Sequence, residues 1–279
     1  MNLVSQVIIK DLFRKYGIKP FKGFGQNFLI NEKILNKIIE SSHLKSEDTV
    51  LEIGPGIGTL TQELAKKAKK VIAVEKDKKM IEILKETLVD FKNIELISAD
   101  ILKTGLANYN LKTKNYKLIS NLPYNIASAV IRKFLESENP PKEMVLTVQK
   151  EVAQRICARP PDMNLLAVSV QFYSDPKIIF YVPKSAFWPN PKVNGAVIRI
   201  ETEGGKREVD KNLFFKIVKA GFSQPRKQIL NNLTKMLKSD KEKVKSWLKE
   251  CKIDCNQRAE TLSIKDWLKL SKIINYRIK

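Results

Sequence analysis

Three glycines at alternate positions constrain the fold of this chain more than any other feature. Residues 50–53 form a mostly apolar run, and Gly54, Gly56 and Gly58 follow it directly. Residues 59–62 fit a capping box, and apolar side chains then recur at helical spacing at residues 60, 64 and 68. A strand, a glycine turn and a capped helix in this order open a nucleotide-binding α/β fold. The glycine spacing differs from the dinucleotide fingerprint, so the turn alone does not identify the ligand.

Further apolar runs extend this pattern into a sheet, and polar side chains follow their ends. Residues 71–74 precede Glu75, and residues 94–97 precede Asp100. An acidic residue at the end of the second strand of such a fold binds ribose hydroxyls. Two acids beside a glycine turn suit a nucleoside with a ribose and an adenine amino group. As an alternative, Asp100 and Asp77 could each cap a helix.

The motif from Asn121 to Asn125 lies between a strand over residues 116–120 and a helix over residues 126–135. Ligands of open α/β sheets bind outside the carboxyl ends of the strands. The Asn121 side chain and the Pro123 carbonyl can accept the two N–H groups of a nucleobase amine, which exposes the nitrogen lone pair. Tyr124 can stack on the ring and orient it. The alternative is an ordinary turn in which the Tyr124 ring only fills space.

The rest of the chain predicts more strands and then helices alone. Asn31 is expected to cap a helix over residues 32–41. Phe187 lies in a loop stiffened by prolines, and it is either a second stacking face for a base or a core aromatic. Residues 164–173 fit a helix or a strand. The other expected helices are 3–16, 150–157, 213–220, 226–237, 241–248 and 264–274, and the other strands are 144–148, 178–182 and 196–200. A composition shift at residues 203–206 separates an expected domain of residues 1–203 from a helical domain of residues 204–279.

The charge balance indicates a polyanionic partner. The chain has 51 basic and 30 acidic residues, a net charge of +21. Residues 205–279 hold 20 basic and 8 acidic side chains, so 20 − 8 = 12 of this excess lies in the last quarter. A nucleic acid is the natural partner for such a surface, and the helical domain would grip its phosphates. The alternative is a solvated, lysine-rich surface.

The cysteines and the hydropathy pattern indicate in which cellular compartment the protein lies. Cys157, Cys251 and Cys255 form no disulfide framework. The last two lie one helical turn apart without further ligands nearby, so we expect two reduced thiols on a helix and no metal. Residues 1–20 carry charges through the apolar pattern and predict no secretory signal, and no apolar run approaches the length of a membrane span. We therefore expect a cytoplasmic protein.

The motifs together resemble the ribosomal RNA small-subunit adenine N6,N6-dimethyltransferase family of bacterial type. The resemblance covers nearly the whole chain, through residues 25–29, 51–61, 121–125, 148–155, 187–193 and 258–263. It implies an α/β, Rossmann-like class I S-adenosylmethionine-dependent methyltransferase with a mostly parallel seven-stranded sheet and a small all-α C-terminal domain. It also implies methyl transfer to the N6 amino groups of two adjacent adenines in a 3′-terminal hairpin of 16S rRNA. The expected partner is the immature 30S subunit, and the expected state is a monomer.

The resemblance also assigns roles to residues of this chain. It implies donor-binding residues at Asn27, Leu29, Gly54, Gly56, Glu75, Asp100 and Asn121. It implies catalytic roles for Asn121, Pro123, Tyr124 and Phe187, RNA contacts at Lys22, Arg226 and Lys227, and no metal. Two departures stand out: Pro225 replaces an arginine that the family usually carries before Arg226, and residues 161–166 lack the expected tyrosine-glycine pair.

Three other functions fit parts of this pattern. A large-subunit (23S) rRNA adenine methylase of the erythromycin-resistance type would share the motifs. A non-catalytic ribosome-assembly factor would share the fold and the charge, although the intact Gly54, Glu75, Asp100 and Asn121 argue against it. A DNA adenine methylase would share the chemistry, but its target motif usually begins with aspartate.

Overall fold

The computed structural model describes residues 1–19, 25–105, 109, 111, 115–202 and 209–278, which fall into two compact units. We call Met1–Ala153 with Pro176–Glu203 the sheet unit, and Gln154–Asp175 with Gly204–Lys279 the helical unit. The composition shift expected at residues 203–206 lies outside the described residues. The helical unit also takes residues 154–175, which the sequence had grouped with the first domain.

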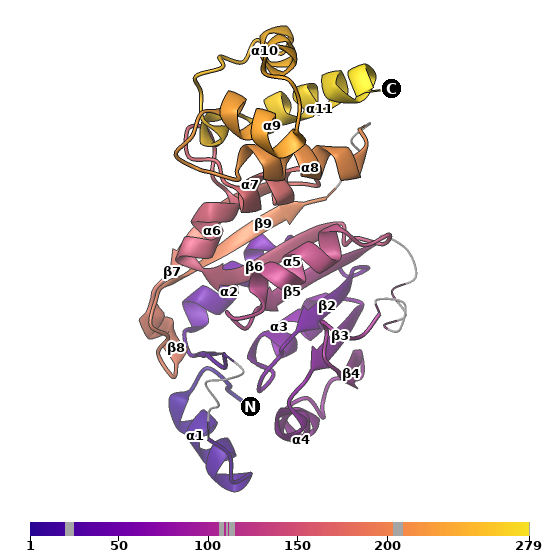
Figure 1. Cartoon of the computed structure of the whole chain (residues 1–279). Coiled ribbons are helices and arrows are strands. Elements are labelled where there is room, and N and C mark those ends of the chain that lie inside the picture. The colour runs from indigo at the N-terminus through magenta and orange to yellow at the C-terminus, as the bar shows by residue number, and fades with distance from the viewer. Residues whose placement is uncertain (20–24, 106–108, 110, 112–114, 203–208, 279) are drawn as a thin grey trace. The chain divides into compact units, whose positions relative to one another are not determined.

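The sheet unit is built on seven strands (Figure 1). Their bounds are β2 Thr49–Ile53, β3 Lys70–Glu75, β4 Ile94–Ser98, β5 Tyr116–Asn121, β6 Glu143–Gln149, β7 Asp175–Val182 and β9 Gly195–Glu201. The strand order is β4-β3-β2-β5-β6-β9-β7. Neighbours from β4 to β6 run parallel, and β9 is antiparallel to β6. The expected mostly parallel seven-stranded sheet is therefore confirmed.

Helices cover both faces of this sheet (Figure 1). They are α2 Glu32–Ser41, α3 Thr59–Lys67, α4 Lys78–Thr87, α5 Ala127–Leu135 and the start of α6 Lys150–Ile156. Helix α1 Gln6–Lys15 packs instead against Phe28, Ile57 and Met80. Leu35 of α2 and Leu64 of α3 pack with Val50, Ile119 and Val145. These three residues lie one on each of the strands β2, β5 and β6, and the register of the strands places them on the same face of the sheet. In Figure 1, α5 lies across the opposite face. Burial of both faces explains why the strands read as nearly continuous apolar runs.

Capping was predicted correctly for one helix and wrongly for another. The Asn31 side chain accepts a hydrogen bond from Ile34 N at 3.0 Å and caps α2, as expected. The capping box expected at residues 59–62 is absent, because α3 begins after Gly58. Thr59 Oγ1 instead donates to Leu3 O at 3.3 Å, and Gln62 Nε2 donates to Thr87 O. These side chains therefore hold the N-terminus and α4 against α3.

A short second sheet connects two segments far apart in the sequence. Strand β1 Phe28–Leu29 pairs antiparallel with β8 Phe187–Trp188. The ring of Phe13 from α1 meets the rings of Phe28 at 5.2 Å and Trp188 at 5.6 Å. A 3₁₀ helix, Lys184–Ala186, precedes β8. The N-terminal segment is thus joined to the loop that follows β7.

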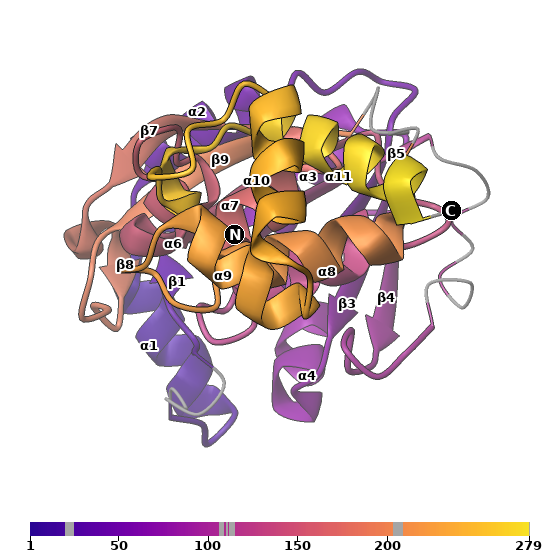
Figure 2. The same cartoon turned by 45° about the horizontal axis from the view of Figure 1, so that its top comes forward.

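The helical unit has its own hydrophobic core around Trp267, which is fully buried. Its helices are α7 Leu165–Gln171, α8 Lys211–Gly221, α9 Ile229–Leu237, α10 Lys241–Glu250 and α11 Ile264–Ile278, with a 3₁₀ helix at Ala259–Thr261 (Figure 2). The ambiguous residues 164–173 are helical, because Asn164 caps α7 by accepting from Ala167 N at 3.0 Å. Val168 and Phe172 pack into this core, which is why the segment belongs to the helical unit.

Two local expectations in the helical unit were wrong. Cys251 caps the C-terminus of α10 and Cys255 lies in the turn beyond it, so the two thiols do not share a helix. The helix expected from residue 226 starts only at Ile229, since Lys227 N donates to Gln224 O in a turn before α9. Within the described residues, no helix combines the length and apolar character needed to cross a bilayer.

Candidate active site

A cleft lies at the carboxyl ends of the central parallel strands and holds two adjoining cavities. Gly54 after β2, Glu75 at the end of β3 and Pro123 after β5 line both of them. The first cavity is also lined by residues 25–29 and by Asn121. The second is lined by Asp100 and the turn that follows it. The predicted donor residues Asn27, Leu29, Gly54, Gly56, Glu75, Asp100 and Asn121 therefore all lie along this cleft.

The glycine turn packs too closely on its neighbours for any larger residue. Gly54 and Gly56 have φ values of +66° and +62°, in the left-handed region. A Cβ on Gly54 would lie 3.2 Å from the ring of Pro123, and a Cβ on Gly56 would lie 3.0 Å from Phe28. The turn thus fits between the target motif and the N-terminal segment, with its backbone exposed to the cleft.

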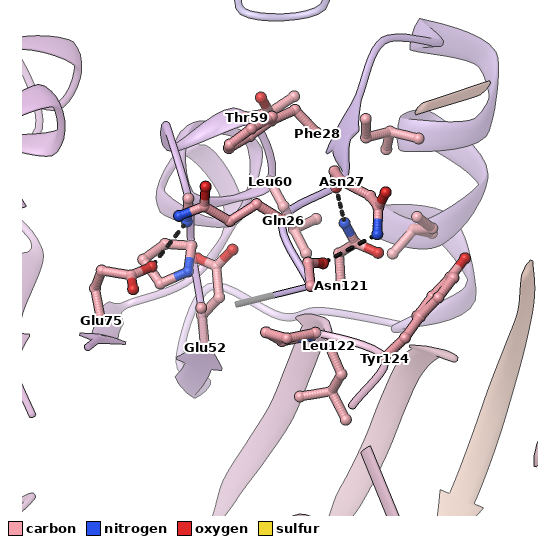
Figure 3. A pocket seen from close by; sticks show the side chains of 17 residues that line it. Gln26, Asn27, Phe28, Glu52, Thr59, Leu60, Glu75, Asn121, Leu122 and Tyr124 are labelled. Carbon is pink, nitrogen blue, oxygen red and sulfur yellow. Dashed lines mark hydrogen bonds between the residues drawn. The ribbon is translucent and has the colours of Figure 1, made fainter. Parts of the chain in front are cut away.

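The Glu75 carboxylate is held in one orientation by backbone groups. Its Oε1 accepts from Lys76 N and Asp77 N at 2.8 Å each. Its Oε2 accepts from Gly56 N at 3.3 Å (Figure 3). Burial raises the pKa of this carboxyl, and the three backbone N–H groups oppose that rise. Oε1 already accepts two N–H groups, whereas Oε2 keeps a lone pair that can accept from a hydroxyl group.

Asp100 caps a turn and does not begin a helix. Its Oδ1 accepts from Leu102 N at 3.0 Å, and its Oδ2 pairs with Lys76 Nζ at 2.9 Å. The hydrogen bond from Lys76 lowers the pKa of Asp100. Of the two candidate caps, Asp77 does cap a helix, because it accepts from Lys79 N at the start of α4. Asp100 is thus an ionised acceptor at the second cavity.

Sequence reasoning missed Lys133, which fixes the turn after Asp100. Its Nζ reaches from α5 and donates to Ile101 O and Thr104 O at 2.6 Å each, and to Leu102 O at 3.3 Å. Desolvation lowers the pKa of this ammonium, and Asp100 opposes that shift. No sequence signal identifies this lysine, because its partners lie about 30 residues away.

Sequence reasoning also missed Glu52, a buried acid that lines the first cavity. Its side chain is 1% exposed, and Oε2 has no hydrogen-bond partner in the part of the chain that the structure describes. Burial raises the pKa of Glu52 to about 8, a hydrogen bond from the Thr61 side chain opposes this rise, and the nearby Glu75 adds to it. A charged residue inside an otherwise apolar strand was the available signal. A buried carboxyl whose Oε2 is unpaired can accept from a cationic or donor group of a ligand.

The Asn121 amide ties the target motif, residues 121–125, to the N-terminal segment, and the Asn27 amide makes a hydrogen bond within that segment. Asn121 Nδ2 donates to Asn27 O at 3.1 Å, and Asn27 Nδ2 donates to Gly25 O at 3.0 Å (Figure 3). Pro123 O accepts from Ile126 N at 3.1 Å and keeps a second lone pair. The predicted Asn121, Pro123 and Tyr124 therefore line one cavity together with Gly54 and Glu75.

Tyr124 is half-buried, and its ring borders the first cavity. Its hydroxyl lies 3.0 Å from the position of a Cβ on Gly195, so a larger residue there would displace it. This oxygen has no hydrogen-bond partner among the residues that the structure describes, and burial raises the pKa of Tyr124 to about 12. The phenol therefore stays protonated at neutral pH and serves as a flat, uncharged face.

The remaining predicted residues do not line either cavity of the sheet unit. Phe187 is 1% exposed and packs in the core with Leu29 and Val182, so the structure places it as a core aromatic and its placement gives the stacking role no support. Arg226 and Lys227 are exposed in the turn before α9 of the helical unit. Lys22 lies outside the described residues.

A comparison with known protein families identifies the chain. A family model described as ribosomal RNA adenine dimethylase matches residues 19–276. The chain belongs to the ribosomal RNA adenine dimethylase family. It is therefore a methyltransferase, and the family and fold imply S-adenosylmethionine as the methyl donor. Both the resemblance seen in the motifs and the Rossmann-like class I fold are confirmed.

Members of this family from several bacteria resemble the chain over most of its length. A protein of Dehalococcoides mccartyi named ribosomal RNA small subunit methyltransferase A is 46% identical over 96% of this chain and 92% of its own. A protein of the same name from Clostridioides difficile is 42% identical over 99% of this chain and 98% of its own.

Two solved structures share the fold of this dimethylase. A dimethyladenosine transferase from Plasmodium falciparum has a TM-score of 0.76 and 28% identity, with coverage of 89% of this chain and 98% of its own. The 23S rRNA methyltransferase ErmE has a TM-score of 0.74 and 25% identity, with coverage of 89% and 100%.

Proposed function

We propose that this protein transfers methyl groups from S-adenosylmethionine to adenine N6 in small-subunit rRNA. The observation that carries the proposal is the meeting of the Asn121 amide with Gly54 and Glu75 in one cleft. The relatives at 42% and 46% identity bear names that specify the small subunit. Two adjacent adenines of a 3′-terminal hairpin in the immature 30S subunit are the proposed target of a cytoplasmic monomer.

Each chemical group of the methyl donor has a matching residue in the cleft. Bound S-adenosylmethionine supplies a methyl group on a positively charged sulfur. Gly54 and Gly56 let the backbone approach the methionine part, and Glu75 takes the ribose hydroxyls. Asp100 faces the adenine amino group. Glu52 lines the cavity on the methionine side, where its unpartnered Oε2 can accept from the donor's ammonium.

The target motif prepares the acceptor nitrogen. The amino lone pair of adenine is delocalised into the ring, which makes it a poor nucleophile. Asn121 Oδ1 and the second lone pair of Pro123 O accept its two N–H groups and favour a pyramidal nitrogen. Tyr124 stacks on the ring and directs the lone pair toward the methyl group. The nitrogen releases a proton readily once it is alkylated, so no strong base is needed.

RNA reaches this cleft with the target base out of its stack. A single-stranded loop makes this extrusion inexpensive in free energy. Arg226 and Lys227 of the helical unit are proposed phosphate contacts, and Pro225 removes one contact that the family usually has. Lys22 is proposed as a further RNA contact.

Methyl transfer to purified subunits tests this function. Labelled donor is incubated with under-methylated 30S subunits and, in parallel, with 50S subunits and duplex DNA. We expect label on adenine N6 of a single 16S rRNA fragment, located by mass mapping, and dimethylated product at completion. Label on 23S rRNA alone would reassign the protein to the type of ErmE, and label on DNA alone would contradict an RNA substrate.

A non-catalytic assembly role is separated by a rescue experiment. Cells that lack the protein receive either the wild type or Asn121→Ala. If the variant fully restored subunit maturation, the binding role would be favoured over catalysis. The intact Glu75, Asp100 and Asn121 support the opposite result.

A further inference from the structure

Strand β7 exposes an aromatic ring that no part of the proposed reaction uses. Tyr181 is 51% exposed, and Ile179, two residues earlier on the same face, is 42% exposed. Lys150 Nζ lies 5.4 Å from the centre of the Tyr181 ring. Phe180 faces the other side of the strand, where it packs against the hydrophobic core beside Val182. Tyr181 is thus a solvent-facing ring with a lysine over it.

Tyr181 and Lys150 lie at the ends of β7 and β6, and the target motif lies at the end of β5, the neighbour of β6. Lys150 is the first residue after β6, whose Thr147 is the neighbour of Asn121 in β5. Lys150 N donates to Asn194 O at 2.9 Å. The next residue, Gly195, is where the Tyr124 hydroxyl and Val182 come together, at 3.0 and 3.5 Å from its Cβ position. Tyr181 therefore directly precedes Val182, the residue of β7 that lies near Gly195 and the Tyr124 hydroxyl, and its own ring lies on the opposite, exposed face of β7.

The chemistry of this surface fits a nucleotide. A flat, exposed ring offers a stacking face to any base, and an ammonium beside it offers a contact to the phosphate. Lys184 and Lys192 are exposed in the loop between β7 and β9, and Glu151 is the acidic residue next to Lys150. The excess of positive charge on the protein favours a polyanionic partner over an apolar one.

We propose that Tyr181 and Lys150 bind a nucleotide adjacent to the target adenine, with its base stacked on Tyr181 and its phosphate near Lys150. The proposal rests on the proposed function, because it takes single-stranded rRNA as the substrate. Extrusion of one base unstacks its neighbour as well, and a second stacking face compensates for that loss. The pair positions the RNA and takes no part in methyl transfer.

Variants on the two faces of β7 test the proposal. Tyr181→Ala is compared with Tyr181→Phe, and Lys150→Ala is compared with Lys37→Ala. Lys37 is a matched control, because its Nζ lies 5.9 Å from the ring of Phe180 on the opposite face of the same strand. The affinity for under-methylated 30S subunits is measured without donor, followed by KM and kcat with donor.

We expect Tyr181→Ala to weaken subunit binding about tenfold and to raise KM with little change in kcat, in the range for loss of one base stack. Tyr181→Phe keeps the ring and stays close to the wild type. Lys150→Ala weakens binding and lowers the slope of log affinity against log salt by about one. Lys37→Ala leaves both quantities unchanged, and ultraviolet crosslinking places an RNA adduct on Tyr181.

Several results would overturn the proposal. They are unchanged binding by Tyr181→Ala, equal losses for Lys37→Ala and Lys150→Ala, and a crosslink from Tyr181 to a ribosomal protein. Binding is measured without donor, so these results stand even if no methyl group is transferred. Absence of transfer by the wild type would reject the proposed function, whereas an active wild type with an unaffected Tyr181→Ala would reject this inference alone.

Discussion

Asn121 Nδ2 donates a hydrogen bond to the backbone oxygen of Asn27 at 3.1 Å, although the two residues are 94 positions apart. The bond fixes the nitrogen end of the amide against the N-terminal segment. Oδ1 is then the end of the amide that can accept from a substrate amine. Residues 25–29, which line the proposed donor cavity, therefore also take part in the geometry of the proposed acceptor site.

Replacement of Asn121 by alanine should abolish most turnover and spare RNA binding. Loss of a preorganised polar contact in the transition state lowers the rate by about 100-fold or more. Single-turnover methylation of under-methylated 30S subunits measures the rate, and filter binding measures the affinity. Asn36→Ala, an exposed asparagine of α2, is the control. A rate close to that of the wild type would remove Asn121 from the mechanism.

Replacement of Lys133 by methionine should weaken donor binding. The ammonium donates to three carbonyls of the turn after Asp100, and its loss lets that turn move. We expect the Kd for S-adenosylmethionine to rise about tenfold, as for a lost hydrogen bond to a charged group, while kcat at saturating donor stays near that of the wild type. The preference for S-adenosylhomocysteine over its inosine analogue should also fall, because we propose that Asp100 accepts from the adenine amino group.

The neighbouring Arg132 provides the control for Lys133. It pairs with Glu136 on the exposed face of α5 at 3.0 Å. Arg132→Met removes a positive charge from the same helix without touching the turn. If Arg132→Met and Lys133→Met weakened donor binding equally, the effect would come from charge and the positioning role would be rejected.

The buried Glu52 should make stability depend on pH. Its pKa is raised from 4.5 to about 8, so the folded protein keeps a proton that the unfolded chain releases. Stability that is fully present below about pH 4.5 is therefore lost as the pH rises through about 8. Urea unfolding of the wild type and Glu52→Gln at several pH values measures this, with the exposed Glu47→Gln as the control. Parallel pH profiles for the wild type and Glu52→Gln would contradict the assignment.

Donor binding should release a proton near pH 7. The donor's ammonium lies near Glu52 in the proposed complex and favours the carboxylate. Titration calorimetry in two buffers of different ionisation enthalpy measures the number of protons released. Glu52→Gln should bind without proton release, and equal release by both proteins would place the ammonium elsewhere.

Replacement of Lys117 by methionine should destabilise the sheet unit. The side chain is 9% exposed, and its Nζ lies 3.2 Å from Asp48 and 3.4 Å from Glu143. Its removal breaks the buried pair with Asp48, leaves Glu143 with Arg199 as its remaining cation, and removes the hydrogen bonds to Ser42 O and His43 O. We expect a loss of about 3 kcal/mol in the free energy of unfolding. Lys70→Met, which breaks an exposed pair with Glu95, should change it by less than about 1 kcal/mol. Similar losses for both variants would refute this reading.

Local patterns were enough to predict most of the sheet unit. The glycine turn, the strand ends at Glu75 and Asn121, and the Asn31 cap depend on neighbours within a few residues. The cap expected at residues 59–62 failed because its side chains bond to partners 25 and 56 residues away. Lys133 was missed for the same reason.

Three residues show how a correct local pattern leaves the outcome open. Phe187 sits in a proline-rich loop that fits either a stacking face or a core residue, and pairing with Leu29 in β1 decides for the core. Glu52 interrupts an apolar strand, but its burial and missing partner depend on the whole fold. Pro225 lies near a helix start, yet the turn closed by Lys227 delays that helix.

The ladder between β1 and β8 joins segments beside the proposed donor and acceptor sites. Phe28 and Leu29 line the first cavity, while Phe187 and Trp188 begin the loop that leads toward Gly195 beside Tyr124. Because the two strands are hydrogen-bonded to each other, movement of the N-terminal segment to release the spent donor would also displace the start of this loop. We therefore expect the enzyme to loosen its hold on RNA at each exchange, a distributive cycle in which monomethylated RNA appears free in solution.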